Sequence, residues 1–290
     1  MKIIIAIKSA AVRSVRSWKS ILILWFSSLL LAGILAIPMK GALKSGLGNS
    51  MITEKLADGI NLEVFADLGA TYKSISSSFS AGIFIVILTG FFLNTFLMGG
   101  LFNKLKRFSG KFSGEEFFQA CAKNFWSFLV ISLIITLIFV TFLVLTVILP
   151  YSFARQAERP RDGDVFNMLT IGILIFFLLL TILLLVLDYA RAWQVSEEKS
   201  ACFKAIGFGF SRTFRTFLSS YPLMIFILIT EFLYVWLILK IIPPIKPVTG
   251  SGIILLFLLS QFLFFVRLLL KTLRYGSVTS LMEQNTDKVY

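Results

Sequence analysis

The side chains best suited to chemistry in this sequence are five polar ones embedded in long apolar stretches: Asn94, Asp188, Glu231, Gln261 and Arg267. An ionisable group is costly to leave unpaired inside a membrane, so the five could form a polar track for an ion or an anionic substrate. They could instead make bonds between helices that fix helix packing. We favour the packing role, because the surrounding sequence is mainly Leu, Ile and Phe and offers little polar lining for a pathway.

Helix geometry indicates which of these residues could meet. At about 1.5 Å per residue, Glu231 and Gln261 each lie roughly 21 Å from the cytoplasmic end of their spans. A hydrogen bond between them is therefore expected if the two spans form a hairpin. Asp188 has two candidate partners. Arg267 could reach it by snorkelling, and Arg191 could pair with it three residues along the same helix.

The sequence offers no recognisable catalytic or cofactor-binding pattern. It contains no His, which removes the commonest general base and metal ligand. No phosphate-binding glycine loop and no nucleophile-base set is visible. Cys121 and Cys202 fall on the side expected to be cytoplasmic, where thiols stay reduced, and Cys121 lies on an apolar helix face, where cysteine packs as a small hydrophobe. We therefore expect no enzyme activity, no cofactor and no metal site.

Long apolar helices must position these residues. The 290 residues are 57% hydrophobic and only 15% charged, a composition typical of a membrane protein. About 20 apolar residues cross a bilayer as a helix. We interpret the first apolar run as a retained span, because the stretch before it is too long for the charged segment of a signal peptide. Six such runs are present: 20–37, 79–102, 126–149, 166–190, 217–239 and 252–275.

The distribution of positive charge predicts the orientation of these spans. Of the 28 basic residues, 19 lie before the first span, in the alternate loops that share its side, or in the last span and tail. Because basic residues gather on the cytoplasmic side, both termini are predicted to be cytoplasmic, in a bacterial-type inner membrane. The net charge of +13 follows from this orientation, and no nucleic-acid partner is needed to explain it.

Three short stretches predict an internal repeat: RSVRSW at 13–18, KNFWSF at 123–128 and RTFRTF at 212–217. Each stands at the entrance to an odd-numbered span and follows apolar residues spaced 3, 4 and 4 apart, the pattern of an amphipathic helix. Ser113 and Glu116 form a candidate capping box at the start of the second helix. Aromatic and basic residues also gather at any membrane interface, which is the alternative explanation.

The predicted repeat unit consists of an amphipathic interfacial helix, an outward span, an outer loop and a returning span. Its basic residues would contact anionic lipid headgroups, at Arg13, Arg16, Lys123, Arg212 and Arg215. The returning spans end in LMGGLFNK at 97–104, LDYARAWQ at 187–194 and LRYGSVTS at 273–280, where small residues allow close helix approach.

The predicted fold is therefore an all-α integral membrane protein with six transmembrane helices arranged as three helical hairpins. It forms a single membrane domain, with repeats at about 1–110, 111–198 and 199–290. The stretch 38–78 is too short for a domain of its own, and it predicts two short helices, at 49–59 and 60–74. These could cap the bundle or contact a partner, and we favour the cap.

The layout, together with EEFFQACAKNFWSFL at 115–129 and LDYARA at 187–192, resembles bacterial six-span membrane families. These include the membrane domain attached to some glycerophosphodiester phosphodiesterases. The resemblance covers most of the chain and implies a membrane domain. It does not imply phosphodiesterase activity, because these 290 residues contain no such catalytic domain.

Two functions fit these features. The first is a non-catalytic membrane component, an accessory or structural subunit that packs against lipid and a membrane protein partner. The second is a small transporter for a lipid or another small molecule, with its site at the repeat interface and Glu231 or Arg267 in contact with the substrate. Loss of function at normal abundance in a Glu231→Gln variant would favour transport, whereas loss of abundance would favour packing.

Overall fold

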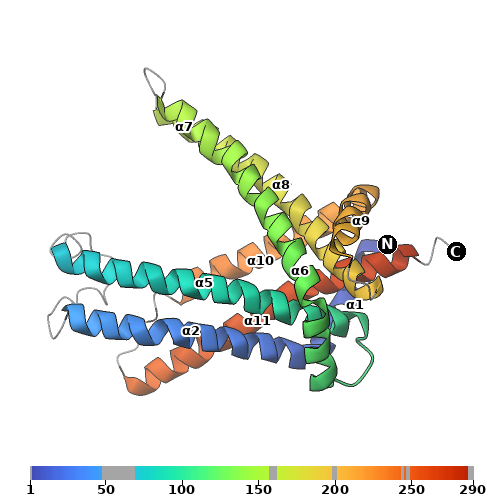
Figure 1. Ribbon diagram of the computed structural model, residues 1–290, viewed down its shortest axis with the longest axis horizontal. Coiled ribbons are helices and arrows are strands. Elements are labelled where there is room, and N and C mark those ends of the chain that lie inside the picture. The colour runs from blue at the N-terminus through green and yellow to red at the C-terminus, as the bar shows by residue number, and fades with distance from the viewer. Residues whose placement is uncertain are drawn as a thin grey trace. The chain divides into compact units, whose positions relative to one another are not determined.

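The computed structural model of the protein describes residues 2–47, 69–156, 162–197, 201–242, 245 and 249–286. Every regular element in these ranges is a helix (Figure 1). The helices are α1 (Lys2–Arg16), α2 (Trp18–Leu47), α5 (Gly69–Lys106), α6 (Gly114–Leu143), the π-helical turn η1 (Val144–Ile148), α7 (Leu149–Gln156), α8 (Asp162–Glu197), α9 (Cys202–Arg215), α10 (Phe217–Ile241) and α11 (Gly250–Thr286).

Six helical stretches are long and apolar enough to cross a membrane, which confirms the six predicted spans and the all-α fold class. The chain is therefore a multi-pass membrane protein. The spans cover Trp18–Ala36, Gly82–Lys106, Gly114–Gln156, Val165–Glu197, Phe217–Ile241 and Gly250–Gln284.

The chain divides into two compact units, Ile23–Asn94 and the rest. In the smaller unit α2 and α5 pack through glycines. A Cβ on Gly82 would lie 3.2 Å from Leu35 Cδ1, and one on Gly90 would lie 3.6 Å from Leu31 Cδ1. The two contacts run in opposite chain directions, so the helices are antiparallel here.

The two short helices predicted between these spans differ in outcome. The first, at 49–59, lies outside the described residues. The second, at 60–74, is described only from Gly69 onward, and there the chain already belongs to α5. Thr71, Tyr72, Lys73 and Ser74 include no helix breaker, so the helix continues without interruption into the apolar run that follows.

The larger unit is built around α8, which packs against α6, α7, α9, α10 and α11 (Figure 1). A second set of contacts joins α1 to α11 and α10 to α11. The fully buried large side chains include Phe102, Phe128, Tyr189 and Tyr275, which come from four different helices. This core lies where the ends of the apolar helices meet, and it positions the candidate site.

The entrances to the odd-numbered spans differ among the three predicted repeats. A break at Ser17 separates α1 from α2, and one at Thr216 separates α9 from α10. In the second repeat α6 runs unbroken from its N-cap Ser113, whose Oγ accepts a hydrogen bond from the backbone N–H of Glu116 at 3.4 Å. The predicted start of this helix is confirmed. A separate amphipathic helix followed by a turn is absent between residues 114 and 143.

The third span is extended by η1 and α7, and the cause is Pro150. Proline has no backbone N–H and cannot donate to the preceding turn, so the chain widens into a π-helical turn just before it. The widened turn allows α8 to approach closely. A Cβ on Gly172 would collide with the carbonyl oxygen of Thr146, so only glycine fits at this point of α8.

Candidate functional site

Three helix crossings frame the candidate site, and each depends on small residues. In every case a helix that leads into an odd-numbered span packs against the end of a returning span: α1 on α11, the start of α6 on the end of α5, and α9 on α8. Small residues permit such close approach between helices. A Cβ on Gly276 would lie 3.3 Å from Ala10 Cα, one on Gly99 would lie 2.9 Å from Ala120 O, and one on Gly209 would lie 2.5 Å from Val186 O.

A buried ion pair joins α8 to α11 beside these crossings. Arg274 Nε lies 3.0 Å from Asp188 Oδ2, and the two side chains are only 9% and 0% exposed. The expected partners of Asp188 were Arg267 and Arg191, and neither makes this contact. Arg267 lies seven residues before Arg274, roughly 10 Å along the helix, and its side chain is exposed.

A second buried arginine lies beside this pair. Arg191 Nη2 donates a hydrogen bond to Ser132 Oγ at 2.8 Å, which ties α8 to α6. Its guanidinium carbon lies 5.7 Å from the centre of the Phe128 ring, within cation–π range. Arg191 and Arg274 both interact electrostatically with Asp188. Two buried arginines thus share one buried acid, and the cluster carries a net positive charge.

Glu231 of α10 interacts electrostatically with this cluster. Its charge interacts with those of Arg274, Lys271 and Arg267. Its Oε1 atom is buried and, among the described residues, accepts no hydrogen bond. The expected bond to Gln261 is not formed; α10 and α11 are joined instead by Tyr234 Oη, which donates to the carbonyl of Leu263 at 2.8 Å.

The five polar residues predicted within the spans therefore do not share one track. Asp188 is buried in the cluster, and Glu231 interacts with it from α10. Gln261 is half-buried and Arg267 is exposed on α11. Asn94 is exposed and belongs to the smaller unit.

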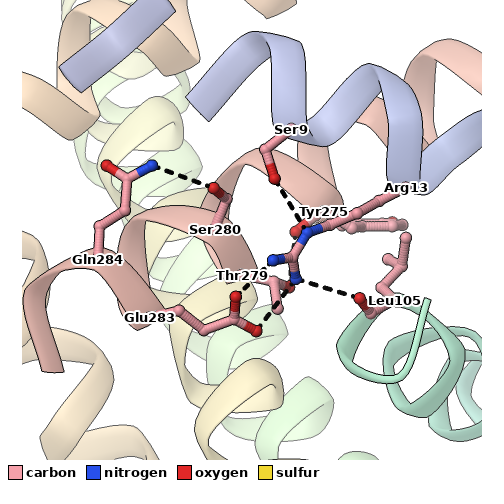
Figure 2. Close-up of polar contacts among 8 residues, drawn as sticks. All are labelled: Ser9, Arg13, Leu105, Tyr275, Thr279, Ser280, Glu283 and Gln284. Atoms are coloured by element: carbon pink, nitrogen blue, oxygen red, sulfur yellow. Dashed lines mark hydrogen bonds and ion pairs between the residues drawn. The ribbon is translucent and has the colours of Figure 1, made fainter. Parts of the chain in front are cut away.

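Arg13 makes a second network that joins three helices (Figure 2). Its Nη1 donates to Glu283 Oε1 of α11 at 3.0 Å and to the carbonyl of Leu105 at the end of α5 at 3.2 Å. Its Nη2 bonds to the other Glu283 oxygen, and its Nε donates to Ser9 Oγ at 3.1 Å. The buried guanidinium is an anchor between helices rather than the predicted contact with lipid headgroups.

The other four predicted headgroup residues have different surroundings. Arg212 is half-buried and donates to the carbonyl of Met282 at 3.2 Å, so it also links its helix to α11. Arg16, Lys123 and Arg215 are exposed. Three of the five basic side chains therefore remain accessible for contact with a headgroup.

The buried face of α1 is not its apolar stripe. Small residues pack inward, with Ala6, Ala10 and Ser14 each fully buried. The predicted apolar stripe faces outward at its ends, since Ile4 is 72% and Val15 60% exposed. Its middle residue Ile7 is half-buried and packs against a buried cluster, so only the ends of the stripe are left without cover.

The helix α9 repeats this arrangement at the same offsets. Ala205, Gly209 and Thr213 are buried, and Phe203 and Phe214 are 74% and 60% exposed. The start of α6 differs, because its stripe is turned partly inward: Phe118 is exposed, whereas Cys121 and Leu129 are buried. The difference arises because α6 is continuous: its first turns cannot rotate about the helix axis independently of the span that follows them.

The sequence contains a signal for the pairing of Asp188 with Arg274, although other partners were expected. Asp188 precedes Tyr189 at the end of one returning span, and Arg274 precedes Tyr275 at the end of another. Residues at equivalent positions of two repeats that converge on one point would face each other. Glu283 gave no comparable signal, because an acid near the end of a chain is usually solvated.

Within the described ranges, no group of three or more acidic or cysteine side chains is placed to hold a metal ion. No protein-family model, curated protein or solved structure matches the chain. The resemblance to six-span bacterial membrane families therefore stays a prediction.

Proposed function

We propose that this protein is a non-catalytic, accessory or structural subunit of a membrane complex that packs against lipid and a membrane protein partner. The observation that carries the proposal is the apolar surface that the chain leaves uncovered. In the most apolar windows of Phe217–Ile241 and Gly250–Gln284, only 17% and 6% of residues are buried inside the protein. Apolar surface of this extent requires lipid or another protein to cover it.

The proposed architecture is three helical-hairpin repeats, each with a helix at the membrane interface. The three small-residue crossings support it, because each leading helix packs on the returning span of the preceding repeat and α1 packs on that of the last. The exposed ends of the apolar stripes of α1 and α9 support an interfacial position, with these apolar side chains toward the acyl region. Arg16, Lys123 and Arg215 would then reach anionic headgroups.

The proposed location is a bacterial inner membrane with both termini in the cytoplasm. The distribution of basic residues supports this orientation. The bond between Arg13 and Glu283 also supports it, because two residues in contact are expected on the same side of a membrane. Both networks of buried charge would then lie near the cytoplasmic face.

The buried charges themselves support a structural rather than a catalytic role. Asp188, Arg191 and Arg274 are almost wholly enclosed and are engaged with one another or with Ser132. A group that must meet a substrate needs access to it, whereas a group that joins helices does not. No cofactor is proposed.

The test is purification of the full-length protein from native membranes in mild detergent, followed by mass spectrometry of co-purifying proteins and lipids. We expect one membrane protein at a fixed ratio to this chain. An unrelated six-span protein, extracted identically, controls for incidental association. Recovery of this chain alone, with a single enriched solute, would overturn the subunit proposal.

The second candidate function, a small transporter, is supported by Glu231. A buried carboxylate oxygen that accepts no hydrogen bond among the described residues is costly in a span unless it has a use. Glu231→Gln keeps the shape and removes the charge. Transport predicts loss of the cellular phenotype at normal membrane abundance. Packing predicts that abundance and phenotype decline together, or that neither changes.

A further inference from the structure

Two adjoining cavities open where α5 turns into α6, in the larger unit. Their volumes are about 380 Å³ and 200 Å³. They share Asn103, Arg107 and Glu116 as walls, so they lie side by side, and we treat them as two parts of one site. The combined size falls within the roughly 300–1,000 Å³ that small-molecule sites in proteins occupy.

The lining of this site is strongly basic. The larger cavity is lined by Lys104, Arg107 and Lys111, and the smaller one by Arg107 and Lys123. Among the described lining residues, Glu116 is the one acid, and it belongs to both cavities. In this described part of the wall, four cationic side chains stand against one carboxylate, and this basic lining favours an anion with several oxygen acceptors. The fork of an arginine and the ammonium groups of lysines both suit phosphate oxygens.

Neutral hydrogen-bond donors complete the polar wall. Asn103, Gln119 and Asn124 line the site with side-chain amides. Asn124 is only 7% exposed, and its amide nitrogen donates to the carbonyl of Ala120 at 2.9 Å. That bond fixes the side chain at the back of the smaller cavity. Amides of this kind can bond hydroxyls or ester oxygens next to a phosphate.

The turn that forms the site is held in shape by its own contacts. Lys104 Nζ donates to the carbonyl of Gly110 at 2.6 Å, which closes the turn. Ser113 caps α6 at the edge of the cavity. Gly100 lets the Phe117 ring approach so closely that a Cβ there would lie 2.7 Å from it. The walls are therefore formed before any ligand arrives, which lowers the entropy cost of binding.

The position of the site indicates which anion it takes. It lies between the span Gly82–Lys106 and the span Gly114–Gln156, at the level where both leave the apolar region. Two aromatic residues, Phe112 and Phe117, form part of its wall, and the neighbouring Phe118 is 48% exposed. A ligand with a phosphate in the cavity could thus rest its apolar part on the adjoining helix surface.

We propose that this cavity binds the phosphate-bearing headgroup of an anionic phospholipid. The proposal rests on the proposed lipid contact of the protein but adds a defined, single site to it. Exposed Arg16 and Arg215 would meet many headgroups in turn. The α5–α6 cavity would hold one lipid, with Arg107 and Lys111 on its phosphate and the side-chain amides on its polar substituents.

The test uses native mass spectrometry of the full-length protein in detergent. The protein is titrated with phosphatidylglycerol and, separately, with phosphatidylcholine of the same acyl chains. We expect the first equivalent of phosphatidylglycerol to bind at least about tenfold more tightly than phosphatidylcholine. The double variant Arg107→Ala/Lys111→Ala should lose this preference, because two charge-assisted contacts account for tenfold or more in affinity.

The matched control is Lys8→Ala/Lys204→Ala, which removes the same charge from two exposed residues, one on α1 and one on α9, that are assigned no headgroup contact. It should change the binding of the first equivalent by less than about twofold. An equal loss of the phosphatidylglycerol preference in both double variants would overturn the proposal, because the preference would then depend on the total charge of the protein and not on the cavity. Retained binding in the cavity variant would overturn it as well. Lys111→Ala alone, at an exposed position outside any helix, provides the measurement if the double variant does not fold.

A third titration, with inorganic phosphate, separates the two sources of a phosphate group. Failure of phosphate to displace the lipid at millimolar concentration supports the lipid proposal. Tight phosphate binding that the cavity variant abolishes would overturn it and assign the site to a free anion. A cavity that fails these tests in a protein that still co-purifies with a partner would refute this inference alone, and the subunit proposal would stand.

Discussion

Asp188 and Arg274 face each other from α8 and α11 at positions that directly precede two buried tyrosines, with Oδ2 and Nε 3.0 Å apart. Both charges have been removed from water, and each is the other's ion-pair partner, with Arg191 as a second basic neighbour of Asp188. The pair is therefore a point at which one substitution has a large effect and two matched substitutions have a smaller one.

Asp188→Ala and Arg274→Ala should each destabilise the protein by about 3–5 kcal/mol, because each leaves one buried charge without its partner. The double variant Asp188→Leu/Arg274→Met should recover part of that loss but not all of it, because Arg191 stays buried without its acid. Thermal unfolding in detergent, followed by the fluorescence of the native tryptophans, measures all three. Arg267→Ala, at an exposed position on the same helix, is the control and should unfold like the unmodified protein. Additive losses in the double variant would contradict the coupling.

Arg13→Ala should loosen α1 from the rest of the larger unit. The ion pair is partly screened, because the Glu283 side chain is 40% exposed, so we expect a loss of about 1.5–3 kcal/mol rather than the full cost of a buried pair. Limited proteolysis should then release the N-terminal helix faster. Arg16→Ala, one turn away and exposed, should not change the rate of cleavage.

Gly209→Ala should destabilise the crossing of α9 and α8, since the added Cβ would lie 2.5 Å from the backbone oxygen of Val186. Gly207 lies two residues away in the same helix and has nothing within 4 Å of the equivalent position. Gly207→Ala should therefore stabilise the helix, by up to about 1 kcal/mol. Opposite signs for the two variants in a thermal-unfolding assay would support the close approach. Equal signs would argue against it.

The native cysteines test both the packing and the proposed orientation. Cys121 is fully buried, whereas Cys202 is partly accessible at the start of α9. A membrane-impermeant maleimide should label inside-out vesicles at Cys202 and leave Cys121 unlabelled, because the reagent reacts with accessible thiols. Cys202→Ser should abolish the signal. Labelling of intact cells from outside would place α9 on the opposite side from the one proposed.

Features that depend on local sequence were predictable. A run of about 20 apolar residues crosses a bilayer wherever it stands in the chain, so the six spans required no knowledge of their neighbours. The start of α6 was equally local, because Ser113 caps its own helix. The same reasoning failed over 114–143, where the repeat pattern predicted a turn that neither proline nor glycine enforces.

Features that depend on how two helices align were not predictable. Arg267 and Arg274 lie two helical turns apart on α11. Which of them meets Asp188 depends on how far α11 is shifted along its axis relative to α8, and hydropathy does not determine that shift. The expectation that Arg13 contacts lipid headgroups was wrong for another reason. A basic residue before a span usually faces headgroups, and only the tertiary contacts with Leu105 and Glu283 reveal that this one is enclosed.

The contact of α1 with α11 has a consequence for biogenesis. Arg13 and its partner Glu283 are separated by 270 residues, so α1 leaves the ribosome long before the helix that must receive it. During that interval its small-residue face has no helix to pack against, and its arginine lacks the Glu283 carboxylate. If synthesis stalls before α11 is made, α1 stays detached. Membrane proteases and chaperones could then recognise an unfinished molecule by its exposed α1.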